Sequence, residues 1–164
     1  MAKKPGILLL VLLLTVSLLY GCSGKDAQQT VTCQELTLSL PGSYLDLSET
    51  VSSDAAAFVY GHESIVVMAT YEDAAILEAY LPGLDALQYA QLFVQTNQLD
   101  SQVTEQDGIP TFTYTVTGED TSLTYLCGVF QSDTRFWVVQ VYCPAPLFTK
   151  CQEQMQQILS SVKI

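Results

Sequence analysis

Apolar residues recur along the chain with two spacings, one typical of strands and one typical of helices. Apolar positions at every second residue, or in short unbroken runs, predict strands over 33–40, 56–60, 64–71, 111–117, 121–130 and 134–142. The second and third of these strands are joined by Gly61-His62-Glu63, which predicts a hairpin. The run Phe136-Trp137-Val138-Val139 is apolar on both sides, which is typical of a central strand covered on both faces.

Two segments have the spacing of amphipathic helices. Glutamines recur on one side of residues 84–98, opposite apolar positions such as Ala90 and Phe93. From about residue 147 to residue 162, one apolar stripe is formed by Leu147, Cys151, Met155, Ile158 and Val162. Residues 73–81 have a weaker pattern that would add only a short helical turn. Strands, a helix, a three-stranded meander and a final helix predict an α+β domain over 32–164, with an antiparallel sheet of about six strands and two main helices packed on it.

The first 22 residues have a different pattern. Lys3-Lys4 is followed by an almost wholly apolar run from Pro5 to Leu19, and the segment ends in Leu19-Tyr20-Gly21-Cys22. This resembles a bacterial lipoprotein signal, which implies that residues 1–21 are removed and that Cys22 is lipidated. Two alternatives stay open: an ordinary cleaved signal that leaves Cys22 in the mature chain, and an uncleaved anchor. The apolar stretch is shorter than the ~20 residues that a spanning helix needs.

Charge limits the partners of the mature chain. Without residues 1–21, the chain has four basic and 17 acidic residues, which gives a formal net charge of −13. Such a body is repelled by nucleic acid and by anionic lipid headgroups, so membrane attachment must come from the lipid on Cys22. Residues 22–31, the lipidated cysteine and a polar stretch, predict a flexible tether that holds the domain close to the extracytoplasmic face of the cell membrane.

The other four cysteines agree with export. An even number in an oxidising compartment indicates two disulfides, with three possible pairings. We predict Cys143–Cys151, because Pro144 and Pro146 turn the chain back, and then Cys33–Cys127 by elimination. Four buried free thiols are the alternative.

A family resemblance covers about residues 32–164. Leu40-Pro41-Gly42 ends the first strand, a mid-chain helix precedes an aromatic-rich meander, and an amphipathic helix ends near Ile158-Leu159-Ser160-Ser161-Val162. This order is similar to the PsbP-like α/β/α fold. The resemblance implies a role in binding or assembly more than a reaction.

Residues suited to catalysis are few. His62, the only histidine, lies in a predicted turn beside Glu63, where a solvated surface role is expected. The sequence has no nucleophile motif or phosphate loop, and residues 100–108 do not have the spacing of a calcium loop, so no catalytic residue, metal ligand or cofactor is assigned. The residues whose pKa values a cleft could shift, and which are therefore the candidates for a chemical role, are His62, Glu72, Asp73 and Asp85.

These observations favour a non-catalytic, lipid-anchored surface domain that binds or assembles an unknown envelope protein. The first alternative is a lipoprotein that binds a small or apolar ligand. The second is an enzyme that uses clustered carboxylates or the thiol of an unpaired cysteine. The nine tyrosines are candidates for a recognition surface, although tyrosines at alternating strand positions also fill cores. A flat aromatic patch would support the first hypothesis, a deep apolar pocket the second, and acids converging in a cleft the third.

Overall fold

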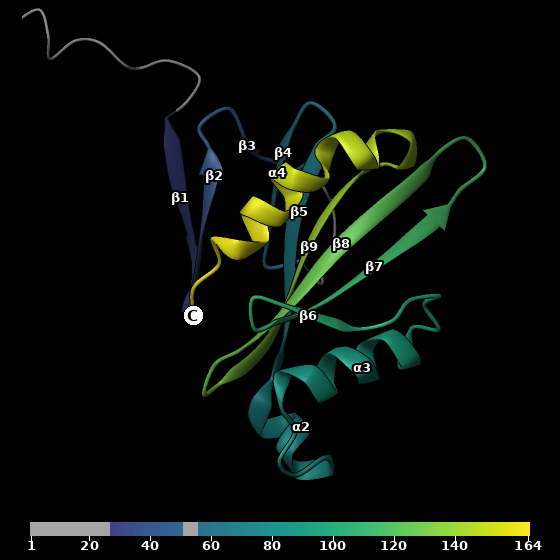
Figure 1. Ribbon diagram of the computed structural model, residues 1–164. Helices are drawn as coiled ribbons and strands as arrows, with labels where there is room; N and C mark the ends of the chain where they lie inside the picture. The colour runs from purple at the N-terminus through teal and green to yellow at the C-terminus, as the bar shows by residue number, and fades with distance from the viewer. Residues whose placement is uncertain (1–26, 51–55) are drawn as a thin grey trace, which may run out of the picture.

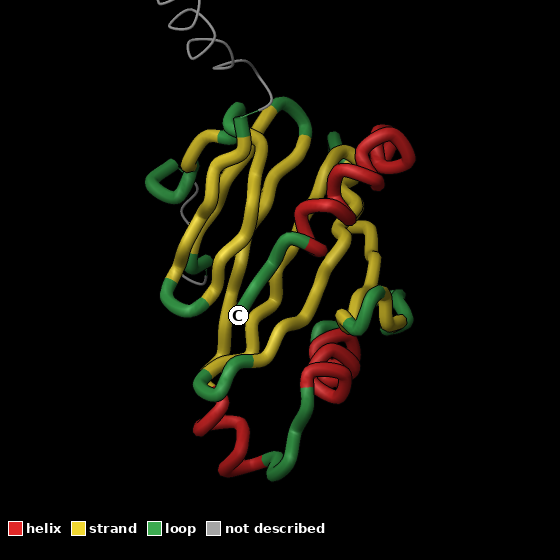
Figure 2. Tube along the Cα trace, turned by 60° about the vertical axis from the view of Figure 1, so that its left-hand side comes forward, coloured by secondary structure: helices red, strands yellow, loops and turns green. Residues whose placement is uncertain are grey.

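The computed structural model describes residues 27–50 and 56–164 (Figures 1 and 2). Within these residues the chain forms nine strands, three α-helices and a single 3₁₀ turn. Their order is β1 (Gln28–Cys33), β2 (Leu36–Pro41), β3 (Leu45–Asp46), β4 (Phe58–His62), β5 (Ile65–Asp73), α2 (Ala74–Tyr80), α3 (Ala86–Thr96), β6 (Thr104–Gln106), β7 (Ile109–Thr117), β8 (Ser122–Gln131), β9 (Arg135–Pro144), η1 (Ala145–Leu147) and α4 (Phe148–Ser160).

Seven strands form the main sheet, in the order β3-β4-β5-β9-β8-β7-β6, and every neighbouring pair is antiparallel. β9 is the middle strand, and its residues 136–141 are buried on both faces. The predicted central strand is therefore confirmed, as are the 56–71 hairpin and the meander. The predicted α+β class with an antiparallel sheet is confirmed too.

One face of the main sheet is covered along most of its length, and we call it the α4 face. The separate β1–β2 hairpin and helix α4 pack on it. Their apolar side chains, including Leu36, Leu38 and Met155, meet Trp137 and Val139 of β9 in the larger core. Lys163 pairs with Thr37 after the end of α4, which fixes the C-terminus to β2.

Helix α3 packs on the opposite face, which we call the α3 face. Asp85 caps this helix: its carboxylate accepts from the amide N–H of Gln88 at 2.8 Å, while the Gln88 side chain accepts from the Asp85 N–H at 3.1 Å. Tyr89 and Ala90 of the helix pack against Phe136 and Val138 of β9 in the second core. This core lies toward the end of the sheet where β9 begins.

The structure corrects several predictions. The tether is shorter than 22–31, because residues from Gln28 on form β1, whose pairing with β2 needs backbone groups and no apolar pattern. The single strand predicted at 33–40 is the turn and second strand of that hairpin. The sheet has seven strands where about six were expected, since β3 and β6 are edge strands too short to show periodicity. A third helix, α2, forms in the weakly patterned 73–81 segment.

All the described helices and strands lie between Gln28 and Ser160. Both cores and all the strand pairings described are formed by residues 28–163. The Cys22 site lies outside the described residues, as does the predicted signal segment.

Candidate functional site

Three tyrosines from three adjacent strands stack on the α3 face. The register places Tyr114 of β7 beside Tyr125 of β8, and Tyr125 beside Tyr142 of β9. The ring centroids are 4.7 Å apart in both pairs, with the first pair parallel to within 3°. Each side chain is half-buried, and Val116, exposed on the same face of β7, extends the apolar surface. The second pair is tilted by 31°. The result is a row of stacked aromatic rings, which we call the tyrosine face (Tyr114, Tyr125, Tyr142 and Gln140).

The hydroxyl groups of the tyrosine face stay protonated. Burial raises the pKa of Tyr142, and burial together with the neighbouring thiol and phenol groups raises the pKa of Tyr114 and of Tyr125. The Tyr114 hydroxyl donates to Oε1 of the buried Gln140 side chain at 3.2 Å. The face is thus uncharged and able to form hydrogen bonds, a combination typical of recognition surfaces.

A groove of about 650 Å³ adjoins the tyrosine face at Gln140. It lies between α3 and β5, and Tyr89, Phe93 and Met68 form much of its wall. Glu72 lies at its edge, where burial first and the Glu72 carboxylate second raise the pKa of Tyr89. Glu72 is the only acid among the residues that line this groove. The groove therefore lacks the pair of converging carboxylates that a carboxylate-based enzyme would need.

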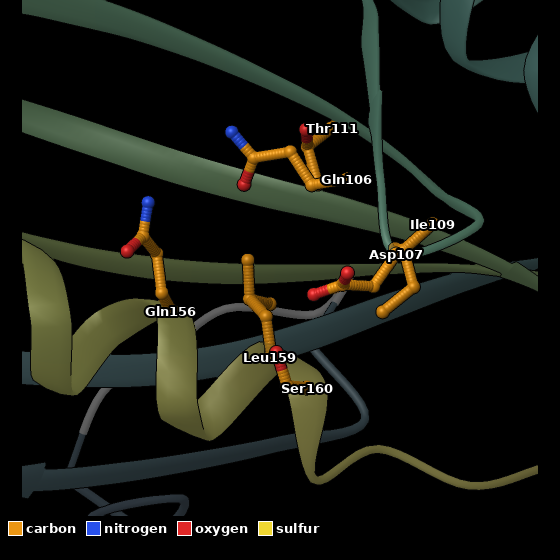
Figure 3. A pocket seen from close by; sticks show the side chains of 7 residues that line it. All are labelled: Gln106, Asp107, Ile109, Thr111, Gln156, Leu159 and Ser160. Atoms are coloured by element: carbon orange, nitrogen blue, oxygen red, sulfur yellow. The ribbon is translucent and has the colours of Figure 1, made fainter.

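A second, smaller pocket of about 360 Å³ lies between the β6–β7 hairpin and α4 (Figure 3). The two-residue turn Asp107-Gly108 has positive φ at both positions, +53° and +79°, which brings the hairpin end back toward the helix. The pocket is lined by Gln106, Asp107, Ile109, Thr111, Gln156, Leu159 and Ser160. Most of these side chains are polar, so the pocket is not the deep apolar cavity that an apolar ligand would require.

The densest polar cluster surrounds Glu35, which lies in the turn between β1 and β2. Its carboxylate accepts from Arg135 Nη1 at 2.7 Å, Ser132 Oγ at 2.9 Å, Thr134 Oγ1 at 3.1 Å and Trp137 Nε1 at 3.2 Å. Burial raises the pKa of Glu35, but the hydrogen bonds outweigh it and hold the pKa at about 2. Glu35 therefore joins the β1–β2 hairpin to the main sheet as an acceptor that is ionised at neutral pH.

His62 does not acquire a catalytic partner among the described residues. Its side chain is 36% exposed at the end of β4, with Nε2 3.6 Å from the exposed Glu63 carboxylate and its ring 5.7 Å from that of Tyr44. Glu72 and Asp73 end β5, and Asp73 Oδ1 lies 3.8 Å from Arg135 Nε. Asp85 caps α3. The structure thus places His62 apart from the three acids, and Glu72, Asp73 and Asp85, which lie near α2 and the start of α3, make separate contacts.

The threonines of β7 point to the α4 face. Thr111 is buried, Thr113, Thr115 and Thr117 are exposed, and Thr115 Oγ1 lies 3.0 Å from Thr124 Oγ1. They form an ordinary, largely solvated strand surface.

The four described cysteines are free thiols. Their positions contradict one of the two predicted disulfides and are compatible with the other. Cys33 packs against the core on the α4 face, whereas Cys127 is fully buried in the core on the α3 face. The Cys33–Cys127 prediction is therefore wrong, because the main sheet lies between the two thiols. Cys143 and Cys151 share the core on the α4 face, where burial first and the Cys151 thiol second raise the pKa of Cys143 to about 11.

The Cys143–Cys151 disulfide stays a prediction for the exported protein. Trypsin cuts after Lys150, between the two cysteines, so a bridge should join the peptides 136–150 and 151–163 until a reductant is added. The bridge should contribute on the order of 2 kcal/mol to the free energy of unfolding. Cys151→Ala is the matched control, and separate peptides from the unreduced wild type would contradict the prediction.

Residues 27–50 and 56–164 contain no group of three or more His, Cys, Asp or Glu side chains placed to hold a metal ion. In the same residues, no helix has the length and apolar character needed to cross a membrane.

The layered arrangement of a twisted antiparallel sheet, a covering hairpin and helices on both faces defines the chain as an α+β protein of PsbP-like fold. It is similar to cyanobacterial PsbP (CyanoP) from Synechocystis sp. PCC 6803, with a TM-score of 0.59 and 10% identity over 88% of this chain and 96% of that one. A crystal structure from Bacteroides thetaiotaomicron VPI-5482 matches with a TM-score of 0.56 and 8% identity over 85% of this chain, which spans only 48% of that protein.

LpqN, described as involved in cell envelope biogenesis of Mycobacterium tuberculosis, is 13% identical over 84% of this chain and 90% of that one, with a TM-score of 0.43. No protein family matches the sequence, and neither does any curated protein. At these identities the likeness shows the fold alone.

Proposed function

We propose that this chain is a lipid-anchored, non-catalytic domain that binds or helps to assemble a protein partner at the outer face of the cell membrane. Residues 1–21 are the signal, Cys22 carries the lipid, and a short polar segment joins it to β1. The tyrosine face is the contact surface for the partner.

The observation that carries the proposal is the stack of Tyr114, Tyr125 and Tyr142. Tyrosine offers a large, rigid surface that is apolar over the ring and polar at the hydroxyl, and it is enriched at protein interfaces. Here three stacked rings form one aromatic row beside a groove, with hydroxyls that stay protonated. A half-buried aromatic surface of this kind favours a protein partner over a small apolar ligand, which needs an enclosed cavity.

The separate contacts of the acids favour a role without catalysis. Glu35 holds its charge in a structural cluster, Asp85 caps a helix, and Glu72 lies beside a protonated phenol. His62 has no nucleophile bonded to it among the described residues. A general base needs hydrogen-bond reach to the proton it removes, and these groups do not converge on one point.

Photo-crosslinking in cells tests the contact surface. A benzoylphenylalanine in place of Tyr125 keeps an aromatic ring in the stack and should give a crosslinked product of defined mass. The same residue in place of Thr115, exposed on the opposite face of the neighbouring strand, should not give that product. Equal products from both positions, or products from Thr115 alone, would assign the contact elsewhere.

A further inference from the structure

Helix α2 and the residue after it form an apolar surface that no described part of the chain covers. The helix has seven residues, none of them buried. Ile76 is 60% exposed, Tyr80 is 81% exposed and Leu81 is 41% exposed. We call these three residues the α2 tip. A short isolated helix is marginal in water, so a helix that keeps its large apolar residues in solvent is typical of an interaction site.

A groove of about 470 Å³ continues the α2 tip onto α3. Tyr80, Leu81 and Leu92 supply its apolar wall, and the glutamines of α3 (Gln88, Gln91 and Gln95) line its polar side. The amide groups of these glutamines can donate to and accept from a chain that lies along the helix. An apolar ridge beside a row of amides matches a partner that is apolar on one side and polar on the other.

The charge around the α2 tip narrows the choice of partner. From residue 27 to residue 134 the sequence has 15 acidic residues and no lysine or arginine. Glu72, Asp73, Glu78 and Asp85 all lie in or beside α2 and the start of α3. Arg135, which approaches Asp73, is already bonded to Glu35 at 2.7 Å. The tip is therefore an apolar surface with a border of net negative charge.

This border argues against two occupants. A second copy of the chain would bring one acidic border against another, which costs free energy. An anionic lipid surface would be repelled in the same way. The tip and the beginning of β1 also lie at opposite ends of the molecule (Figures 1 and 2), so a chain held to a membrane at its N-terminal end would point the tip away from it.

We infer that the α2 tip docks a cationic amphipathic segment of another protein, whose apolar side chains cover Ile76, Tyr80 and Leu81 while its lysines or arginines face the acidic border. The inference rests on the proposed function in one respect, that the domain acts by binding a protein. It concerns a surface at the far end of α3 from the tyrosine face and can fail on its own.

A labelled helical peptide made only of leucine and lysine, binding to residues 27–164, tests the inference by fluorescence anisotropy. We expect binding that weakens as salt is added. The double variant Ile76→Ser with Tyr80→Ser should weaken it at least about tenfold. Because neither residue is buried, the thermal midpoint should stay unchanged. The control Leu45→Ser removes an equally exposed apolar residue (67%) from β3 and should leave the affinity unchanged.

Several outcomes would overturn the inference. Equal binding of the peptide by the double variant and the wild type would mean that the peptide responds to net charge alone. Binding of a lysine homopolymer as tight as that of the leucine–lysine peptide would mean the same. A dimer at micromolar concentration that Tyr80→Ser dissociates would assign the tip to a second copy. Binding of residues 27–164 to phosphatidylcholine–phosphatidylglycerol vesicles, lost in the double variant, would assign it to a membrane. A negative result at the tip combined with a product at Tyr125 would leave the proposed function intact.

Discussion

Cys22→Ala should release the protein from the membrane fraction or leave it as an unprocessed precursor. Stable attachment of a soluble domain takes two acyl chains, or one chain with a polybasic patch. The mature chain has only four basic residues against 17 acidic ones, so its surface cannot replace the lipid. We therefore expect nearly complete loss of the mature, membrane-bound form, measured by fractionation and by the mass of the N-terminal peptide.

Cys33→Ala is the matched control for this change. It removes a half-buried thiol from the domain and leaves Cys22 in place, so the protein should remain attached. The two alternative readings of the segment give different results. An ordinary cleaved signal would leave both proteins soluble, and an uncleaved anchor would keep the Cys22→Ala protein on the membrane with residues 1–21 still present. A Cys22→Ala protein that is processed and attached like the wild type would contradict the lipid anchor.

Sequence analysis predicted those parts of the fold in which the buried side chains recur with a regular spacing. β9 is buried on both faces and α4 on one, so hydrophobic periodicity located both elements. β1 has Val31 as its only fully buried residue, because it forms half of a hairpin at the edge of the molecule. Its polar residues therefore resembled a tether. Such strands depend on backbone pairing with a neighbour, which leaves almost no trace in side-chain pattern.

The candidate surfaces depend on register and on long-range contacts. The tyrosines of the meander were recognised as candidates, but their stacking requires knowing that residues 114, 125 and 142 stand opposite one another. The Glu35–Arg135 pair joins residues 100 positions apart, and no local motif marks Glu35. The Cys33–Cys127 pairing failed for the same reason, since elimination along the sequence says nothing about which face of a sheet a thiol occupies. The exposed α2 tip was missed because its pattern is too short to show amphipathicity.

Replacing Glu35 by glutamine should destabilise the domain at neutral pH by about 2 kcal/mol, the usual range for hydrogen bonds to a charged group. The carboxylate accepts from four side chains that lie 97 to 102 residues away, and these bonds hold the β1–β2 hairpin against the main sheet. A neutral amide accepts more weakly and leaves the Arg135 guanidinium without its closest negative partner. Urea unfolding at neutral pH measures the loss.

The same variant should change how stability depends on pH. The pKa of Glu35 is about 2 in the folded protein, below its ordinary value of 4.5, so its contribution is complete above about pH 4.5. As the pH falls from about 4.5 to about 2, the carboxylate is protonated more readily in the unfolded chain, and the contribution disappears. The wild type should therefore lose more stability than Glu35→Gln across this interval, and the two unfolding curves should converge toward pH 2. Glu63→Gln, at an 81% exposed side chain, is the control and should follow the wild type. Parallel pH profiles for wild type and Glu35→Gln would show that the Glu35 cluster does not hold the hairpin to the sheet.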